Sequence, residues 1–185
     1  MQYLIFIGGL VGVGMFIYGV KILYKIYTTK DILQFNLNDN LNKIIIYKEG
    51  YYSINLIGGF GIISNPINVI INSLNEKEKI VVTSNSRNYT FLKKWKRAIE
   101  LYQFEIKSIG EYEVSIKNYE KLILKKSQLK IYQFFEKKQK ISNIKVLIKE
   151  TVPNSIKIKG IICLTLGANI GAWGIILGIN PQIFG

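Results

Sequence analysis

Residues 3–20 have the sequence YLIFIGGLVGVGMFIYGV, and none of them is charged. As a helix rising about 1.5 Å per residue this stretch would be about 27 Å long, close to the roughly 30 Å of a bilayer's hydrocarbon core. Lys21 and Lys25 follow it, where long cationic side chains can reach the headgroups. A cleaved signal peptide would have its basic residues before the apolar run. Residues 1–27 are therefore predicted to be an uncleaved transmembrane helix with its interfacial end.

A second uncharged run, residues 160–179, has the sequence GIICLTLGANIGAWGIILGI. Its length is sufficient to cross a bilayer, and the alternative is a buried core helix. We predict a second transmembrane helix within residues 160–185. Asn169 is its one strongly polar residue, and we expect it to form a hydrogen bond across the helix pair rather than a functional site.

Glycines recur at helical spacing in both runs. Residues at such intervals share one helical face, and small residues there let helix backbones approach closely in lipid. Gly9 and Gly14 fall outside the pattern. The glycines predicted to form packing faces are Gly8, Gly12 and Gly19 in the first run, and Gly160, Gly167, Gly171, Gly174 and Gly178 in the second.

The lysines predict the orientation in the membrane. Lys21 and Lys25 follow the first run, Lys157 and Lys159 precede the second, and the terminal segments carry no basic side chain. Cytoplasmic loops are enriched in Lys and Arg. We therefore expect an integral, two-pass protein with a cytoplasmic central domain and both termini outside, although long domains can translocate regardless of charge.

The segment 28–159 changes from helical period to period two. Tyr112, Val114 and Ile116 alternate with polar residues, as do Tyr52 and Ile54 with their neighbours. Short alternating runs separated by turn residues are typical of antiparallel sheets with one solvated face. The fold class predicted is a mostly β membrane protein, in which an antiparallel β-sandwich of jelly-roll or immunoglobulin-like type lies between the two helices.

Two short segments resemble a recurring pattern of β-sandwich modules. In residues 104–114, FEIKSIGEYEV, a strand ends, a glycine turns the chain, and Tyr112 enters the next strand. Residues 48–54, KEGYYSI, are similar. This is the arrangement of a tyrosine corner, and the resemblance implies a sandwich fold without indicating a particular family.

Composition excludes several classes of function. The net charge is +13 from 25 basic and 12 acidic residues, but only Arg87 and Arg97 are arginines, so we attribute the excess to surface lysine and expect no nucleic-acid partner. The chain has no histidine and one cysteine, Cys163. Because both need histidine, Ser–His and Cys–His catalysis are excluded. We predict no catalytic residues, no metal ligands and no cofactor.

The remaining motifs have ordinary structural interpretations. Residues 58–61, GGFG, follow a strand without the Lys-Ser/Thr of a phosphate loop and predict a hairpin turn. The carboxylates Glu100, Glu105, Glu111 and Glu113 are expected on the surface. A basic run could contact anionic headgroups or form a charged edge that discourages aggregation. Its residues are Lys93, Lys94, Trp95, Lys96 and Arg97.

The leading functional hypothesis is a non-enzymatic, membrane-anchored β-sandwich that binds a protein partner, as a subunit or adaptor of a membrane complex or as an immunity-type protein. The partners expected are the lipid bilayer and an unidentified protein, or another copy through the spans. The alternative is a membrane effector whose glycine-faced helices oligomerise to perturb or gate the bilayer.

Overall fold

A computed structural model describes residues 2–39, 41–75, 78–84, 89–127, 129–180 and 182. The chain divides into two compact units. Residues 1–29 and 152–185 form the helical unit, and residues 30–151 form the β domain.

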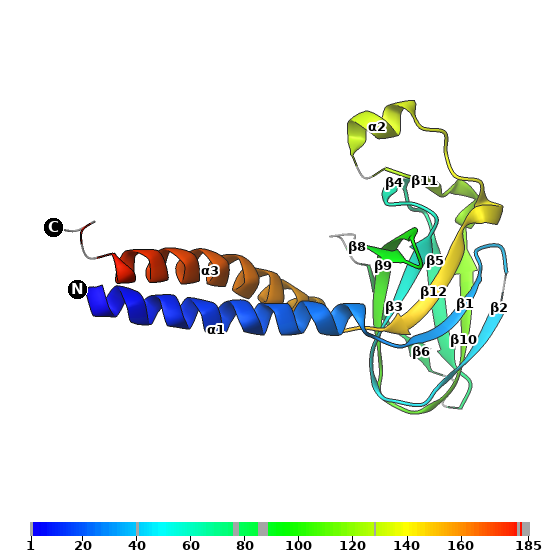
Figure 1. Ribbon diagram of the computed structural model, residues 1–185. Helices are drawn as coiled ribbons and strands as arrows, with labels where there is room; N and C mark the ends of the chain where they lie inside the picture. Colours follow the sequence, from blue (N-terminus) through cyan, green and yellow to red (C-terminus); the bar gives the residue numbers. More distant parts are fainter. Residues whose placement is uncertain are drawn as a thin grey trace. The chain divides into compact units, whose positions relative to one another are not determined.

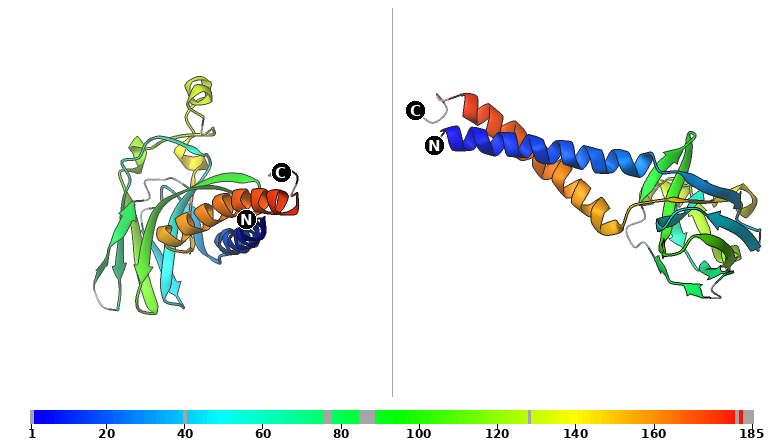
Figure 2. Two further views of the ribbon diagram at one scale, coloured as in Figure 1. Left: turned by 90° about the vertical axis from the view of Figure 1, so that its left-hand side faces the viewer. Right: turned by 90° about the horizontal axis from the view of Figure 1, so that it is seen from below.

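The helical unit consists of α1 (Gln2–Tyr27) and α3 (Asn154–Ile179). The two helices pair in antiparallel fashion and cross, as both views in Figure 2 show. Both are long and apolar enough to cross a membrane, and only 17% of the most apolar window of each is buried. Because a core helix would bury most of its surface, this exposure distinguishes them from one. Helix α3 begins earlier than the predicted Gly160, with Pro153 as its N-cap, whose carbonyl oxygen accepts hydrogen bonds from the Ile156 and Lys157 amides at 3.0 and 3.1 Å.

The β domain contains twelve strands within the described residues (Figure 1). They are β1 (Asp31–Asn36), β2 (Leu41–Ile46), β3 (Gly50–Ile57), β4 (Gly61–Ser64), β5 (Asn68–Ser73), β6 (Lys79–Ile80), β7 (Val82–Ser84), β8 (Thr90–Lys93), β9 (Lys96–Ile106), β10 (Gly110–Lys117), β11 (Ile123–Lys125) and β12 (Lys145–Glu150). Helical turns occur at η1 (Tyr119–Lys121), α2 (Lys130–Phe135) and η2 (Ile141–Asn143).

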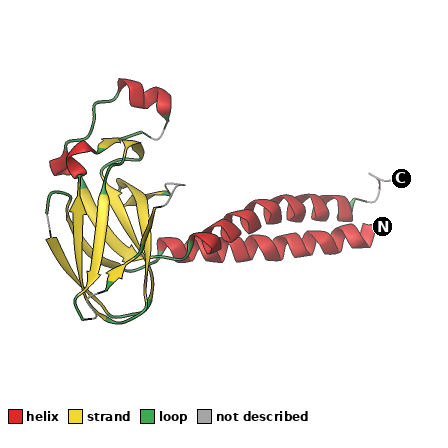
Figure 3. Cartoon of the chain, turned by 180° about the vertical axis from the view of Figure 1, so that it is seen from behind, coloured by secondary structure: helices red, strands yellow, loops and turns green. Residues whose placement is uncertain are grey.

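Every strand pairing among the described residues is antiparallel, which confirms the prediction of a mostly antiparallel β domain. The larger sheet has the order β1-β12-β3-β9-β7, with β8 also paired to β9. The second sheet has the order β2-β10-β5-β6, and β11 pairs with β4. Figure 3 shows the strands of both sheets in yellow.

One hydrophobic core draws on both sheets, and alternation places its residues. In β10, Tyr112, Val114 and Ile116 are buried, while Glu111 is exposed. The core also contains Ile54 of β3 and Val146 of β12 from the larger sheet. Burying a Val, Leu or Ile side chain stabilises a fold by about 1.5–3 kcal/mol, so this core is the main source of the domain's stability.

The prediction of one solvated face fails on the larger sheet. Ser53 and Asn55 of β3 alternate with apolar residues, yet both are fully buried. Glu100 of β9, expected on the surface, is also buried. The physical reason is a second, smaller apolar cluster on this side of the sheet, where Phe91 of β8 packs against Ala98 and its neighbours.

Two tyrosine corners join the sheets. The chain passes from β2 to β3 and from β9 to β10 through short links, and each link is followed by a glycine and, two residues later, a buried tyrosine. The Tyr52 hydroxyl donates to the Lys48 carbonyl oxygen at 2.5 Å, and the Tyr112 hydroxyl donates to that of Ser108 at 2.6 Å. Both hydrogen bonds reach back four residues, as in a tyrosine corner, so the resemblance noted in the sequence extends to the geometry.

The corners also anchor the core. The ring of Tyr52 stacks on Phe104, with centroids 5.8 Å apart. Burial raises the pKa of Tyr52 above its ordinary value, and electrostatic interaction with Glu150 and with the Tyr112 side chain raises the pKa further. The hydroxyl therefore keeps its proton at neutral pH and remains a donor to the turn.

Candidate functional site

The predicted glycine faces lie where α1 and α3 come closest. A Cβ atom placed on Gly174 would lie 2.5 Å from the Cα of Gly9, and one on Gly19 would lie 2.6 Å from the Leu164 nitrogen. Cβ atoms on Gly12 and Gly167 would likewise meet backbone of the opposite helix. Glycine is therefore the residue that permits this backbone separation.

The contacts follow a regular antiparallel register. Residue 6 lies opposite 178, residue 9 opposite 174, residue 12 opposite 171, residue 16 opposite 167, residue 19 opposite 164 and residue 22 opposite 160. The contact positions on α3 are therefore spaced by threes and fours, a repeat of about 3.5 residues that is typical of left-handed helix pairs.

Gly8, which was predicted to lie on the packing face, lies outside the contact between α1 and α3. A Cβ on Gly8 would meet nothing within 4 Å, whereas one on Gly9 would lie 2.7 Å from the carbonyl carbon of Gly174. A repeat of about 3.5 residues counted back from Gly12 falls midway between positions 8 and 9. Spacing alone therefore does not determine whether Gly8 or Gly9 lies at the contact. The structure selects Gly9.

Asn169 is a second correction. It follows Gly167 by two residues, or about 200° around the helix, so it faces away from α1. Its side-chain nitrogen donates to the Thr165 carbonyl of its own helix at 2.8 Å, and the residue is exposed. The hydrogen bond across the pair comes instead from Gln2, whose side-chain nitrogen donates to the Gly178 carbonyl at 2.8 Å.

The basic run at residues 93–97 forms a hairpin between β8 and β9. Lys93 pairs with Lys96 across a two-residue turn, so Lys94 and Trp95 occupy the turn. These two have φ values of 46° and 64°, a left-handed conformation that bulky residues rarely adopt. The Trp95 side chain is 94% exposed at the turn. Lys93 forms an ion pair with Asp31, so the run does not act as one uniform cationic patch.

The last two residues of the run line a pocket of about 270 Å³. Four separate segments contribute to its walls, and its cations come from β9, β12 and the residue after β11. The lining residues are Ile57, Gly58, Lys96, Arg97, Lys126, Asn143 and Lys145. Sequence reasoning located Lys96 and Arg97 but missed Lys126 and Lys145, because single lysines carry no local signal.

The segment around α2 is a second feature that sequence reasoning missed. It is closed at its base by hydrogen bonds: the Gln139 amide donates to the Leu124 carbonyl at 2.8 Å, and the Ser127 amide donates to a Glu136 carboxylate oxygen at 2.9 Å. The side chain of Gln133 donates to the Ser127 carbonyl at 3.0 Å. The polar side chains thus hold the segment in shape, and Figures 1 and 3 show α2 standing off the sheets.

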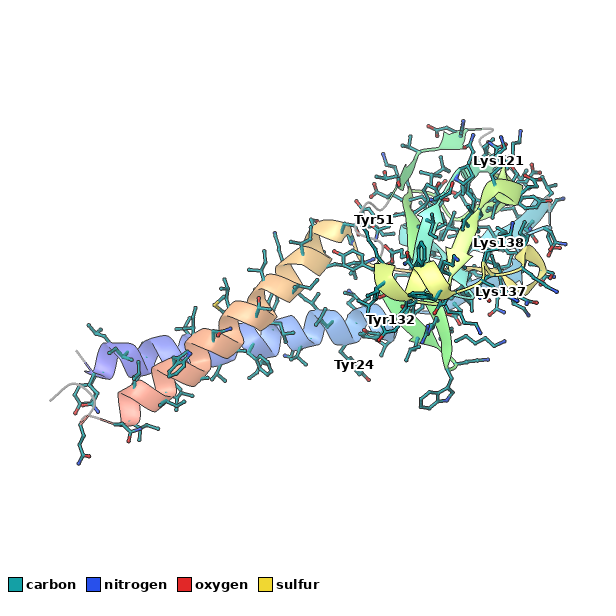
Figure 4. The ribbon with its side chains drawn as sticks, turned by 90° about the horizontal axis from the view of Figure 1, so that it is seen from above. Tyr24, Tyr51, Lys121, Tyr132, Lys137 and Lys138 are labelled. Carbon is teal, nitrogen blue, oxygen red and sulfur yellow. The ribbon has the colours of Figure 1, made fainter. Side chains whose placement is uncertain are left out.

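The apolar side chains of this segment point outward. Ile131 is 70% exposed, Phe134 is 85% exposed and Phe135 is 81% exposed. Figure 4 looks down on α2, with Tyr132, Lys137 and Lys138 labelled around it. A hydrophobic group this exposed is typical of an interaction site.

Within the described residues, no three His, Cys, Asp or Glu side chains come together so as to hold a metal ion. Some of the buried polar groups on the larger sheet form hydrogen bonds with one another, although Asn55 Oδ1 has no such partner. Asn55 donates to Ser53 Oγ at 3.0 Å, and Gln103 donates to Glu100 Oε1 at 2.9 Å.

No protein-family model matches this chain, and no curated protein shows significant sequence similarity to it.

Proposed function

We propose that this chain is a two-pass integral membrane protein whose β-sandwich domain binds a protein partner and catalyses no reaction. The central domain faces the cytoplasm and both termini lie outside, in keeping with the lysines that border the two helices.

The surface of the helical unit supports membrane insertion. Large apolar side chains point away from the helix contact, including Leu4, Leu10 and Leu166. In water such a surface would drive aggregation, whereas in hydrocarbon it is the favourable arrangement. The glycine contact also suits lipid, where close packing replaces the hydrophobic effect between helices.

The observation that carries the partner proposal is the exposed apolar face of α2. Ile131, Phe134 and Phe135 stand at positions i, i+3 and i+4, the spacing with which helices insert anchors into grooves. Lys130 precedes these residues in the chain, and Lys137 and Lys138 follow them. The complementary partner is a protein with an apolar groove and an acidic rim.

The glycine faces favour this proposal over the membrane effector. They contact each other within one chain, so neither face is free to assemble copies. Association through the exposed apolar face of α2 is then a more direct interpretation than assembly through the glycine faces.

The experiment places a photo-activated cross-linking residue at Phe134 or at Tyr47, which is 72% exposed in the link between β2 and β3. Native membranes are irradiated, washed with alkaline carbonate, and analysed by mass spectrometry. We expect the chain to remain in the pellet and to form a protein adduct from position 134 only. Adducts to lipid alone, or equal adducts from both positions, would contradict the partner site. Release of the chain into the wash would contradict membrane insertion.

A further inference from the structure

We propose that the pocket lined by Lys96, Arg97, Lys126 and Lys145 binds the phosphate group of an anionic ligand. The site is separate from α2, so it adds a binding activity that the partner proposal does not require. Its ligand is defined by chemistry: a phosphate carried by a soluble compound or by a lipid headgroup.

The pocket is strongly cationic. Four of the seven residues that line the pocket are cationic, and none of those seven is acidic. Of the described carboxylates, none lies within ion-pair distance of these four cations. Like charges gathered around one cavity repel one another, and an anion in the cavity converts that repulsion into attraction. A bound anion therefore stabilises the fold by mass action.

Two contacts within the β domain orient the Arg97 side chain. One of its terminal nitrogens donates to the Lys126 carbonyl oxygen at 2.7 Å, and its guanidinium lies over the Phe60 ring at 5.5 Å from the centroid. These two contacts fix the plane of the guanidinium before any ligand arrives. An ordered guanidinium presents its remaining N–H groups as a fork that matches two phosphate oxygens.

The cations of the pocket lie at or next to the ends of strands. Lys96 and Arg97 start β9, Lys145 starts β12, and Lys126 follows β11 directly, so strands rather than free loops position the cations. The Gly58 amide donates to the Arg97 carbonyl at 2.8 Å, which fixes the β3 end against β9. Ile57 of β3 and Asn143 of η2 complete the lining.

Size and charge together indicate phosphate. A cavity of about 270 Å³ lies just below the usual range for small-molecule pockets, about 300–1,000 Å³. It accommodates a compact headgroup or a small phosphate ester. Basic pockets of this kind are suited to phosphorylated headgroups, and lysines supply point charges around the arginine fork.

The test is lysine footprinting on the full-length protein. The acylation rates of Lys96, Lys126 and Lys145 are measured by mass spectrometry, with Lys43 and Lys117 as exposed reference lysines outside the pocket. One arm uses neutral detergent micelles with inorganic phosphate against chloride at equal ionic strength. The other uses nanodiscs of phosphatidylcholine with or without phosphatidic acid.

We expect the pocket lysines to be protected about tenfold relative to the reference lysines, and Arg97→Gln to remove that protection, a change equivalent to about 1.4 kcal/mol. The matched variant Lys117→Gln, with the same loss of charge, should retain protection. Protection by inorganic phosphate in micelles identifies a soluble ligand, and protection only in phosphatidic acid nanodiscs identifies a headgroup. Equal protection of pocket and reference lysines, or none in either arm, would overturn the site while leaving the α2 proposal intact.

Discussion

The helical unit and the β domain achieve close contact by opposite means. Between α1 and α3 at least one residue of each contacting pair is glycine, and most of the large side chains point outward. Within the β domain, large rings such as Tyr52 and Tyr112 fill the interior, and their hydroxyls tie down the turns. The same chain therefore has glycine where two backbones come into contact and large side chains where water is excluded from a core.

The largest expected effect comes from filling the helix contact. Gly9→Leu should separate α1 from α3, because even a Cβ at this position would lie 2.7 Å from the Gly174 backbone. Gly8→Leu is the matched control on the adjacent residue, where a Cβ meets nothing within 4 Å. Cysteines at Leu4 and Ile179, in a Cys163→Ala background, report the helix pairing in membranes through a short bismaleimide cross-linker, which can join side chains that point away from the contact.

We expect Gly9→Leu to abolish this cross-link and Gly8→Leu to leave it unchanged. The reverse result would show that the sequence pattern with Gly8 was right. No effect from either change would show that the glycines are ordinary membrane composition and that other contacts hold the helices together.

The next effect is the removal of a tyrosine corner. Tyr112→Ala should destabilise the β domain by about 3–5 kcal/mol, as truncation of a buried aromatic ring does. Tyr112→Phe retains the ring and loses the hydrogen bond to Ser108, so its cost should be about 1 kcal/mol. Urea unfolding of residues 30–151 measures both. A loss below about 1 kcal/mol for Tyr112→Ala would show that the ring is not a core element.

Local patterns in the sequence were sufficient for much of this fold. The alternation in β10 predicts its buried face, and the spacing of Gly110 and Tyr112 predicts the corner, because each depends on neighbours in the chain. The choice between Gly8 and Gly9 was beyond such reasoning, since it depends on the crossing of two helices that are far apart in sequence. The burial of Asn55 likewise depends on β8 and β9, which follow much later.

The candidate sites were less accessible to sequence reasoning for the same reason. Lys126 and Lys145 enter the pocket through strand pairing, and neither belongs to a motif. The exposure of Phe134 gives no signal either, because the same residues at helical spacing would be expected in a core. In both cases, long-range packing decides whether a side chain is structural or free to bind.

The smallest effect concerns the hairpin turn, where the chain does not use glycine although the backbone favours it. Lys94 and Trp95 both have positive φ, and a two-residue hairpin turn of this kind prefers Asn-Gly. The double variant Lys94→Asn, Trp95→Gly should therefore stabilise residues 30–151 by about 1–2 kcal/mol, since each strained residue costs on the order of 1 kcal/mol or more. Because Trp95 is 94% exposed, the variant removes little packing.

A raised urea midpoint at unchanged slope would show that the chain tolerates strain in order to present a tryptophan and a lysine at this turn. An unchanged or lowered midpoint would show that the turn carries no strain, and the contrast with the glycine-lined helix pair would then not extend to the β domain.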